Sequence, residues 1–527
     1  MARYAYERLS AQDATFLWAE QPSQPMHVGA VAILEGGRLQ REAGGIDIEA
    51  YRAAVESVLH WVPRYRQKLA WVPVEGWPVW IDDRSFDLGY HIRHIALPAP
   101  GGLDQLKELT ARINARPLDR QRPLWEIWVI EGVEGGEQFA VLNKVHHCMI
   151  DGAAGADLTQ ILMSPAPRVE VGDPMPYMPR PAPSAFELLR DTVGRAVMRP
   201  AELARDAFFD VRDAGTAGSA EVLPRMRALA NLLGYTVWPV SDTPINGELG
   251  SHRRLEWLTM PLDNLRELRG VLGCTVNDIV LATVAGAMRR YLFRRRVDSR
   301  QIDFRVAAPV STRRPEHDRR QGNHVSTWIV PLPLDEDDPL DRVAIIHRRT
   351  QECRRARSDL AVDTLMRVAE WLPAAIVARG VGLASGPDNM IVTNVPGPRF
   401  PLYMVGARLL GLYPLVPLLP SSGLGVALFS YEDKLCWGFN GDYEIVPDLP
   451  VFVDDVRVAF EELRKATVSH YMARRTHEVE IPVTDAPTVA SVTPVVKRER
   501  RPRRRKARSE TSRPGSREAV IDGGRSS

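Results

Sequence analysis

The segment Val145-His146-His147-Cys148-Met149-Ile150-Asp151-Gly152 places two adjacent imidazoles, a carboxylate and a glycine within one short stretch. The residues before it, 138–145, are rich in β-branched and aromatic side chains, as are residues 124–133, and Gly135-Gly136 separates the two runs. This pattern predicts a β-hairpin. A small and apolar stretch, 152–163, predicts a helix after it. We therefore expect the histidines where a strand turns into a helix, a corner at which a rigid scaffold presents side chains to a cleft.

The chemistry that these residue types allow is proton transfer. An imidazole has an ordinary pKa of about 6.5, so it can accept a proton near neutrality and return it within one turnover. A general base is the natural role for such a pair. Asp151 follows His147 by four residues, where its carboxylate can fix the ring tautomer or pair with an arginine and hold the loop. Gly152 allows close approach of the backbone.

Two other interpretations of the histidine pair remain open on the residues alone. A histidine near a strand end is often a hydrogen-bonded structural residue. His146, His147 and Asp151 are also the residue types of a two-histidine, one-carboxylate metal site, but adjacent strand residues point to opposite faces, so we predict no metal. The sequence contains no Gly-x-Ser-x-Gly elbow, and a covalent serine route has no support.

The pattern His-His-x-x-x-Asp-Gly resembles the active-site motif of the CoA-dependent acyltransferase superfamily. That superfamily includes nonribosomal peptide condensation domains, chloramphenicol-acetyltransferase-like enzymes and the bacterial wax ester synthase/diacylglycerol acyltransferase family. Further segments resemble the last family, in its order and up to about residue 465; they are Leu9-Ser10-Ala11-Gln12-Asp13 with Phe16-Leu17, Pro25-Met26-His27-Val28-Gly29, Pro123-Leu124-Trp125-Glu126, Asn277-Asp278 and Asn394-Val395-Pro396-Gly397-Pro398.

The resemblance implies an O-acyltransferase that uses long-chain acyl-CoA as co-substrate and holds no resident cofactor. His147 would be the general base, His146 secondary, and Asp151 would maintain the loop with Gly152. The substrate-binding residues that it implies are Pro123, Leu124, Trp125, Asn277, Asp278 and Asn394. From the residues alone, capping of a helix by Thr275 and Asp278 would equally explain that aspartate, and Pro396-Gly397-Pro398 would equally be a rigid turn.

The fold class that we expect is mixed α/β, because strands and helices occur without regular βαβ alternation. The resemblance implies two chloramphenicol-acetyltransferase-like sandwich domains around a central cleft. We place an N-terminal domain at 1–164, a proline-rich and helical connection at 165–245, a C-terminal domain at 246–480 and a disordered tail at 481–527. Residues 165–183 contain seven prolines, which disfavour helix. The apolar row of the following helix, from Phe186 to Val197, is expected to pack on the body of the protein.

Charge and cysteine usage bound the remaining choices. The formal charge of +2 conceals a tail, 497–527, with twelve Lys or Arg against four Asp or Glu, a balance of +8 that leaves the rest at −6. Such a tail lacks the apolar content to order itself and favours anionic lipid over specific nucleic acid. Four widely spaced cysteines and no apolar leader fit a cytoplasmic protein, peripherally bound to membrane or lipid droplets.

The acceptor alcohol is the least constrained part of the prediction. The family resemblance permits diacylglycerol or a long-chain fatty alcohol, and we favour diacylglycerol. Alternatives are a polyketide or peptide-type acceptor and a catalytically silent lipid-binding protein. A transmembrane span in the uncharged stretch 411–431 is opposed by its three prolines and by Gly423 and Gly425, so we predict two buried strands there.

Overall fold

The computed structural model describes residues 6–42, 44–149, 161–167, 171–194, 240–311, 325–356, 374 and 388–479. Asp151 and Gly152 of the predicted site lie outside these ranges, as do the basic tail and the body of the helix predicted at 152–163. The described residues up to Arg474 belong to one compact unit, and the chain from Arg475 onward belongs to another.

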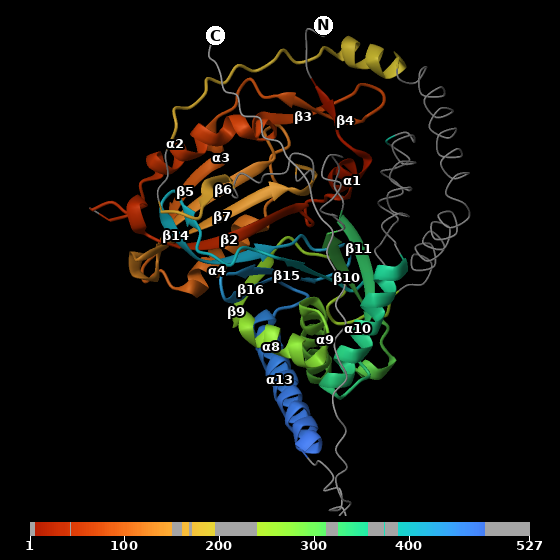
Figure 1. The fold of residues 1–527 in the computed structure, drawn as a ribbon. Coiled ribbons are helices and arrows are strands. Elements are labelled where there is room, and N and C mark those ends of the chain that lie inside the picture. Colours follow the sequence, from red (N-terminus) through yellow and green to blue (C-terminus); the bar gives the residue numbers. More distant parts are fainter. Residues whose placement is uncertain are drawn as a thin grey trace, which may run out of the picture. The chain divides into compact units, whose positions relative to one another are not determined.

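The histidine pair is carried by a sheet of seven strands in the order β5-β6-β7-β2-β14-β13-β8 (Figure 1). Its strands are β2 (His27–Glu35), β5 (Ile92–Ala96), β6 (Trp125–Val133), β7 (Gln138–His146), β8 (Met163–Ser164), β13 (Tyr403–Met404) and β14 (Ala407–Leu415). β5 is parallel to β6, and the other neighbours are antiparallel. The predicted hairpin is confirmed as β6 and β7, joined by the 3-10 turn η4 (Glu134–Gly136).

Both faces of this sheet are buried, which explains the nearly continuous apolar runs of β6 and β7. Val129, Phe139 and Val141 pack in the cluster under α1 and α2, whereas Ile130 and Leu142 pack in the cluster under α4. The helices and 3-10 turns of this half are α1 (Ala11–Ala19), α2 (Ile48–Val58), α3 (Leu88–His91), α4 (Leu103–Asn114), η1 (Gly37–Leu39), η2 (Leu59–Trp61), η3 (Pro63–Arg66) and η5 (His147–Met149). Each long buried side chain contributes roughly 1.5–3 kcal/mol to folding.

The second half of the sequence contributes β13 and β14 to this first sheet, where β14 pairs with β2. β14 also crosses β16 at Gly438, where an added Cβ would lie 1.9 Å from the carbonyl oxygen of Pro414. Only glycine allows this approach. Beside the crossing, Tyr413 stacks on Trp257 with ring centroids 5.3 Å apart. The two halves therefore share a sheet and a core rather than meeting as separate bodies.

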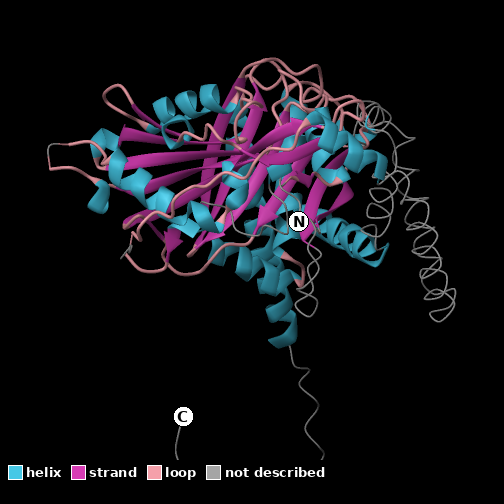
Figure 2. Cartoon of the chain, turned by 90° about the horizontal axis from the view of Figure 1, so that it is seen from above, coloured by secondary structure: helices cyan, strands magenta, loops and turns pink. Residues whose placement is uncertain are grey.

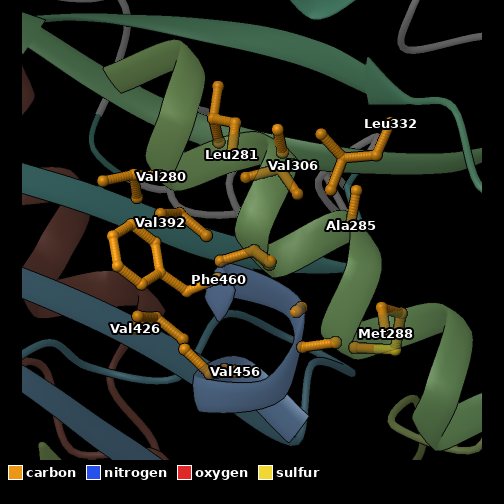
Figure 3. Packing of buried hydrophobic residues seen from close by; sticks show 14 of the residues in the cluster. Val280, Leu281, Ala285, Met288, Val306, Leu332, Val392, Val426, Val456 and Phe460 are labelled. Carbon is orange, nitrogen blue, oxygen red and sulfur yellow. The ribbon is translucent and has the colours of Figure 1, made fainter. Parts of the chain in front are cut away.

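A second sheet has the order β11-β10-β12-β15-β16-β9. Its strands are β9 (Arg253–Pro261), β10 (Phe304–Ser311), β11 (Val325–Leu332), β12 (Met390–Val395), β15 (Leu424–Tyr431) and β16 (Lys434–Asp442). The helices are α8 (Leu262–Leu272), α9 (Val276–Arg294), α10 (Pro339–Ala356) and α13 (Leu449–Val479), with η6 (Ser299–Gln301). In Figure 3, Val280 and Met288 of α9 share one core with Val306, Val426 and Phe460. The mixed α/β class is confirmed, with helices against the sheets in Figure 2.

A third, smaller sheet contains residues 71–81, whose apolar and aromatic composition alone predicts a single strand. It has the order β1-β4-β3, formed by β1 (Glu7–Arg8), β3 (Gln67–Trp71) and β4 (Pro78–Asp82). Residues 71–81 are therefore a hairpin turn and the ends of two strands, not one strand. The turn contains Pro73, Val74 at φ 67° and Gly76 at φ 69°, a combination of turn residues that outweighed the apolar composition.

The helix at residues 185–194 also differs from the prediction. Phe186 and Val193, which were expected to pack on the body, are 74% and 56% exposed, whereas Leu188 is 4% exposed. Leu188 packs with Val72 and Trp77, and Thr192 donates to Glu75. The helix is thus rotated so that the face with Leu188 and the polar Thr192, rather than its apolar row, meets the third sheet.

The last correction concerns the C-terminal strands. The sequence pattern predicts a strand at residues 443–446, but they form a turn, because the Asp442 carboxylate accepts the amides of Glu444 and Ile445. The strand before them, β16, was not predicted. The two strands predicted within 411–431 are present as the end of β14 and β15. No single helix among the described residues is long and apolar enough to cross a membrane; α8 and α9 meet the requirement of length and composition only as a pair, and that pair is bent by 102°.

Candidate active site

The histidine pair lies at the end of β7, where both neighbouring strands hold the backbone. His146 is opposite His27 of β2 in the strand register, and its amide donates to the carbonyl of Leu124 at 2.9 Å. The next amide, of His147, donates to the carbonyl of Met26 at 2.8 Å, and the 3-10 turn η5 begins there. The residues just before β6 and β2 therefore hold the end of β7. The histidine pair lies at this strand end, as the sequence pattern predicted.

The segment Pro123-Leu124-Trp125 contacts the site through its backbone and is otherwise core. All three residues are buried, and Trp125 is 0% exposed. The Trp125 indole donates to the carbonyl of Tyr65 at 2.7 Å and stacks on His91 with ring centroids 4.5 Å apart. In this conformation the segment supports the end of β7, and its predicted contact with substrate remains a prediction.

The His147 imidazole is half-buried and stacks on Phe16 of α1, with ring centroids 3.8 Å apart and an interplanar angle of 18°. Its Nδ1 is buried and has no hydrogen-bonding partner in the described part of the chain. The exposed part of the side chain is therefore not Nδ1. Burial lowers the pKa of His147 to about 4, partly opposed by its own backbone. The ring is therefore neutral at pH 7, the form in which an imidazole accepts a proton.

His146 points into the protein and is tied to Glu20, which follows α1. Its Nδ1 accepts the amide of Cys148 at 3.1 Å, so a proton on the neutral ring belongs on Nε2. That atom lies 3.5 Å from Glu20 Oε1, too far for a strong hydrogen bond but close enough for electrostatic attraction. His146 is 0% exposed, which makes it a structural partner of the site rather than a group that meets solvent.

Glu20 connects the elements that converge on the histidines. Its Oε2 accepts from Arg120 Nη2 at 2.8 Å and Nε at 3.0 Å, and its Oε1 accepts the amide of Met26 at 3.1 Å. Burial opposes ionisation of Glu20, but the interactions with His146, Arg120 and Met26 prevail and lower its pKa to about 2. Glu20 is therefore a buried carboxylate that fixes Met26, whose carbonyl in turn holds His147.

A second buried polar cluster contains His27, Asn114 and Lys144. His27 Nε2 is 3.0 Å from Asn114 Oδ1, and Lys144 donates to the carbonyls of Ile113 and Arg116 at the end of α4. Burial, assisted by Lys144, lowers the pKa of His27 to about 3, and burial lowers that of Lys144 to about 8. A cation at a helix C-terminus is stabilising, so this cluster anchors α4 against β2 and β7.

Asn277 and Asp278 lie at the start of α9 in the second half. Thr275 and Asp278 form a reciprocal capping box, which confirms the predicted capping geometry. The buried Asp278 carboxylate also accepts from Thr350 at 2.8 Å and lies 2.7 Å from His347 Nδ1, both on α10. Asp278 thus joins two helices, and Asn277 is half-buried beside it. Their contact with substrate remains a prediction.

The Asn394 segment is a close backbone crossing. Asn394 is half-buried on β12, opposite Leu428 of β15. At Gly397 an added Cβ would lie 2.2 Å from the carbonyl oxygen of Ser430, so this turn requires glycine. This geometry fits the interpretation of the segment as a rigid turn. It does not test whether Asn394 binds substrate.

The loop before Met26 brings the site to the second half of the protein. Gln24 Nε2 donates to the carbonyl of Leu418 at 3.2 Å, and Arg253 donates to the carbonyl of Ser23. The site therefore forms where the two halves meet. In the described ranges, no group of three His, Cys, Asp or Glu side chains is placed to hold a metal ion.

Sequence reasoning missed Glu20, Arg120 and the contact of Phe16 with His147. Phe16 was noted only as part of a family-like segment, and Glu20 only as the end of a predicted helix. A Glu–Arg pair separated by 100 residues leaves no periodic signal, because the pairing depends on the fold. The one available signal was a carboxylate six residues before Met26-His27.

Comparison with known proteins identifies the family of the chain and agrees with its fold. The wax ester synthase/diacylglycerol acyltransferase catalytic domain matches residues 9–280, and the C-terminal domain of the same family matches residues 321–464. The chain belongs to the wax ester synthase/diacylglycerol acyltransferase family. A protein from Mycobacterium tuberculosis strain H37Rv, described as a probable diacylglycerol O-acyltransferase, is 34% identical over 451 residues, 84% of this chain and 92% of the relative.

Solved structures give the same family and fold. The wax ester synthase/diacylglycerol acyltransferase from Marinobacter aquaeolei VT8 matches with a TM-score of 0.60 and 25% identity, covering 87% of this chain and 99% of that one. The first condensation domain of the calcium-dependent antibiotic synthetase matches with a TM-score of 0.53 and 17% identity, covering 87% of this chain and 97% of that one, which concerns the fold alone. The protein is therefore an acyl-CoA-dependent acyltransferase of the wax ester synthase/diacylglycerol acyltransferase class.

Proposed function

We propose that this protein transfers a long-chain acyl group from acyl-CoA to the free hydroxyl of diacylglycerol, giving triacylglycerol, with His147 as the general base. The observation that carries the assignment of the base is the state of that ring. It is half-buried, neutral at pH 7 and held at a strand end where the two halves of the protein meet. Of the two histidines, His146 is fully enclosed and bonded on Nδ1.

In the proposed reaction, His147 takes up one proton and then returns it. Nδ1 of His147 has no hydrogen-bonding partner in the described ranges, and for Nε2 to act as the base the proton of the neutral ring must be on Nδ1. Nε2 takes the hydroxyl proton as the acceptor oxygen attacks the thioester carbonyl. When the C–S bond breaks, the imidazolium returns that proton to the CoA thiolate. No acyl-enzyme forms and no resident cofactor takes part.

The other predicted residues support this step in different ways. We propose that Asp151 and Gly152 maintain the loop after η5, and that Pro123, Leu124 and Trp125 act by holding the end of β7. Leu124 accepts the amide of His146, which supports such a role. Asn277, Asp278 and Asn394 are proposed to line the side of the site formed by the second half.

The acceptor is tested by measuring thiol release from long-chain acyl-CoA with diacylglycerol and hexadecanol offered separately, followed by identification of the ester. We expect faster release with diacylglycerol and triacylglycerol as its product. Faster release with hexadecanol would make the protein principally a wax ester synthase. Release with neither alcohol, despite binding of both substrates, would favour a silent lipid-binding protein and contradict the proposal.

We also propose peripheral association with membrane or lipid droplets on the cytoplasmic side. The segment 497–508 contains nine basic residues and one acidic residue, and each basic residue near an anionic surface contributes about 1 kcal/mol. Removing residues 482–527 should abolish salt-sensitive flotation with phosphatidylserine vesicles and spare thiol release with soluble substrates. Unchanged flotation of the truncated protein would contradict this role of the tail.

A further inference from the structure

The Phe16 side chain stacks on the His147 ring. The two rings are nearly parallel, at an interplanar angle of 18°, and 3.8 Å apart between centroids. Phe16 is half-buried, so its ring covers one face of the imidazole rather than filling a distant part of the core. This contact joins α1 to the turn η5, which begins at His147.

The helix that carries Phe16 is firmly held. Ser10 caps α1 by accepting the amide of Asp13, and Leu17 is buried in the core. Arg120 donates to the carbonyl of Leu17 at 2.7 Å and also binds Glu20. Both ends of α1 are therefore anchored, so Phe16 is presented from a fixed backbone.

The orientation of the His147 ring needs such a contact. Catalytic histidines are commonly oriented by a carboxylate or carbonyl bound to the second ring nitrogen. In the described part of the chain, no other side chain binds Nδ1 of His147. Unless it is held, an imidazole can rotate about χ2, and rotation would turn Nε2 away from an acceptor hydroxyl.

We infer that Phe16 is a positioning residue for acyl transfer, whose ring fixes the plane of the His147 imidazole and keeps water from one of its faces. This inference rests on the proposed role of His147 as general base. A misplacement of about 1 Å at a reacting group can reduce the rate about 100-fold. Loss of the stacked ring should therefore act on the chemical step and not on acyl-CoA binding.

The test compares Phe16→Ala, Phe16→Leu and Phe16→Tyr in the full-length protein, with kcat and KM for long-chain acyl-CoA measured from pH 4 to 8. Phe16→Ala should lower kcat about 10- to 100-fold and leave KM within about threefold. Because burial is the main cause of the low pKa of His147, the acid limb of kcat should move up toward the ordinary value of about 6.5. Phe16→Tyr keeps the stacked ring and should retain kcat and the acid limb.

A matched control is available in the same half of the protein. Phe86 is also half-buried and stacks on a histidine, His91, at 5.2 Å and 16°, but His91 has no proposed part in the reaction. Phe86→Ala should affect thermal stability without moving the acid limb of kcat. Equal shifts of that limb in Phe86→Ala and Phe16→Ala would mean that any lost ring produces the effect, and would overturn the inference.

Other outcomes separate this inference from the proposed function. Wild-type kcat and pH profile in Phe16→Ala would refute the positioning role alone. If that variant does not fold, Phe16→Leu, which keeps apolar bulk without a planar ring, decides: a reduced kcat with unchanged KM supports the role, and a wild-type kcat refutes it. Full activity of His147→Ala would instead refute the proposed function, whatever the Phe16 variants do.

Discussion

Replacing Glu20 by Gln should weaken both the fold and the reaction, because this carboxylate links Arg120, the amide of Met26 and His146. Its pKa falls from 4.5 to about 2 in the folded protein. At about 1.4 kcal/mol per pKa unit, ionised Glu20 contributes about 3 kcal/mol to the free energy of unfolding at pH 7. Glutamine can still accept from Met26, and Arg120, whose side chain is 38% exposed, can be hydrated, so about 3 kcal/mol is the upper limit.

Urea unfolding at several pH values tests the sign of this effect. A carboxylate with a lowered pKa stabilises the fold above its unfolded value, and that contribution is lost as pH falls through its folded value. The stability difference between wild type and Glu20→Gln should therefore be constant from pH 8 to 5 and shrink between pH 4.5 and 2. A difference that grows toward acid pH would refute the reasoning.

Asp82→Asn is the matched control for Glu20→Gln. Hydrogen bonding from Arg180 lowers the pKa of Asp82 to about 2, but Asp82 lies on β4 of the third sheet, and none of its recorded partners belongs to the histidine site. Both variants should be less stable. Only Glu20→Gln should also reduce kcat for thiol release, because only Glu20 links Arg120 and His146 to the segment that holds His147, and loss of its charge weakens both links. Equal kcat in the two folded variants would show that Glu20 has no part in supporting the site.

Two further predictions test the polar core. Asp278→Ala should cost about 2 kcal/mol in urea unfolding, since a cap and charge-assisted hydrogen bonds are lost. It should also raise KM for acyl-CoA, because Asp278 is proposed to line the site; an unchanged KM would limit Asp278 to its structural role. Burial lowers the pKa of His27 to about 3 and of His91 to about 4, so both stay neutral in the fold while the unfolded chain takes up protons below pH 6.5. Stability should fall as pH drops from 7 to 5, by about 2 kcal/mol per histidine, and His91→Gln should flatten that slope; an equally steep slope in the variant would contradict the assignment.

Local patterns predicted much of the fold. Hydrophobic periodicity alone predicts strands at 253–261 and 325–332 and a helix at 262–272, and these are β9, β11 and α8. Thr275 with Asp278 forms the predicted cap. Errors occurred where a local signal was overridden. The apolar composition of residues 71–81 hid a turn, and the strand β16 was missed beside a turn that its own last residue, Asp442, organises.

The site was predictable only in part. The position of His147 at the end of a strand follows from the β-branched and aromatic run of β7 and from the residues after it. Its environment does not, because Phe16, Glu20 and Arg120 reach it from elements distant in the sequence. The pairing of β14 with β2 is likewise a long-range contact, and no periodicity within either strand specifies its partner.

The most direct measurement is thiol release from long-chain acyl-CoA and diacylglycerol by His147→Ala, with circular dichroism and thermal unfolding to establish that the variant is folded. The account predicts a folded protein whose release falls to the uncatalysed rate. A folded His147→Ala protein that releases CoA and forms triacylglycerol at the wild-type rate would contradict the central claim that this imidazole carries the proton.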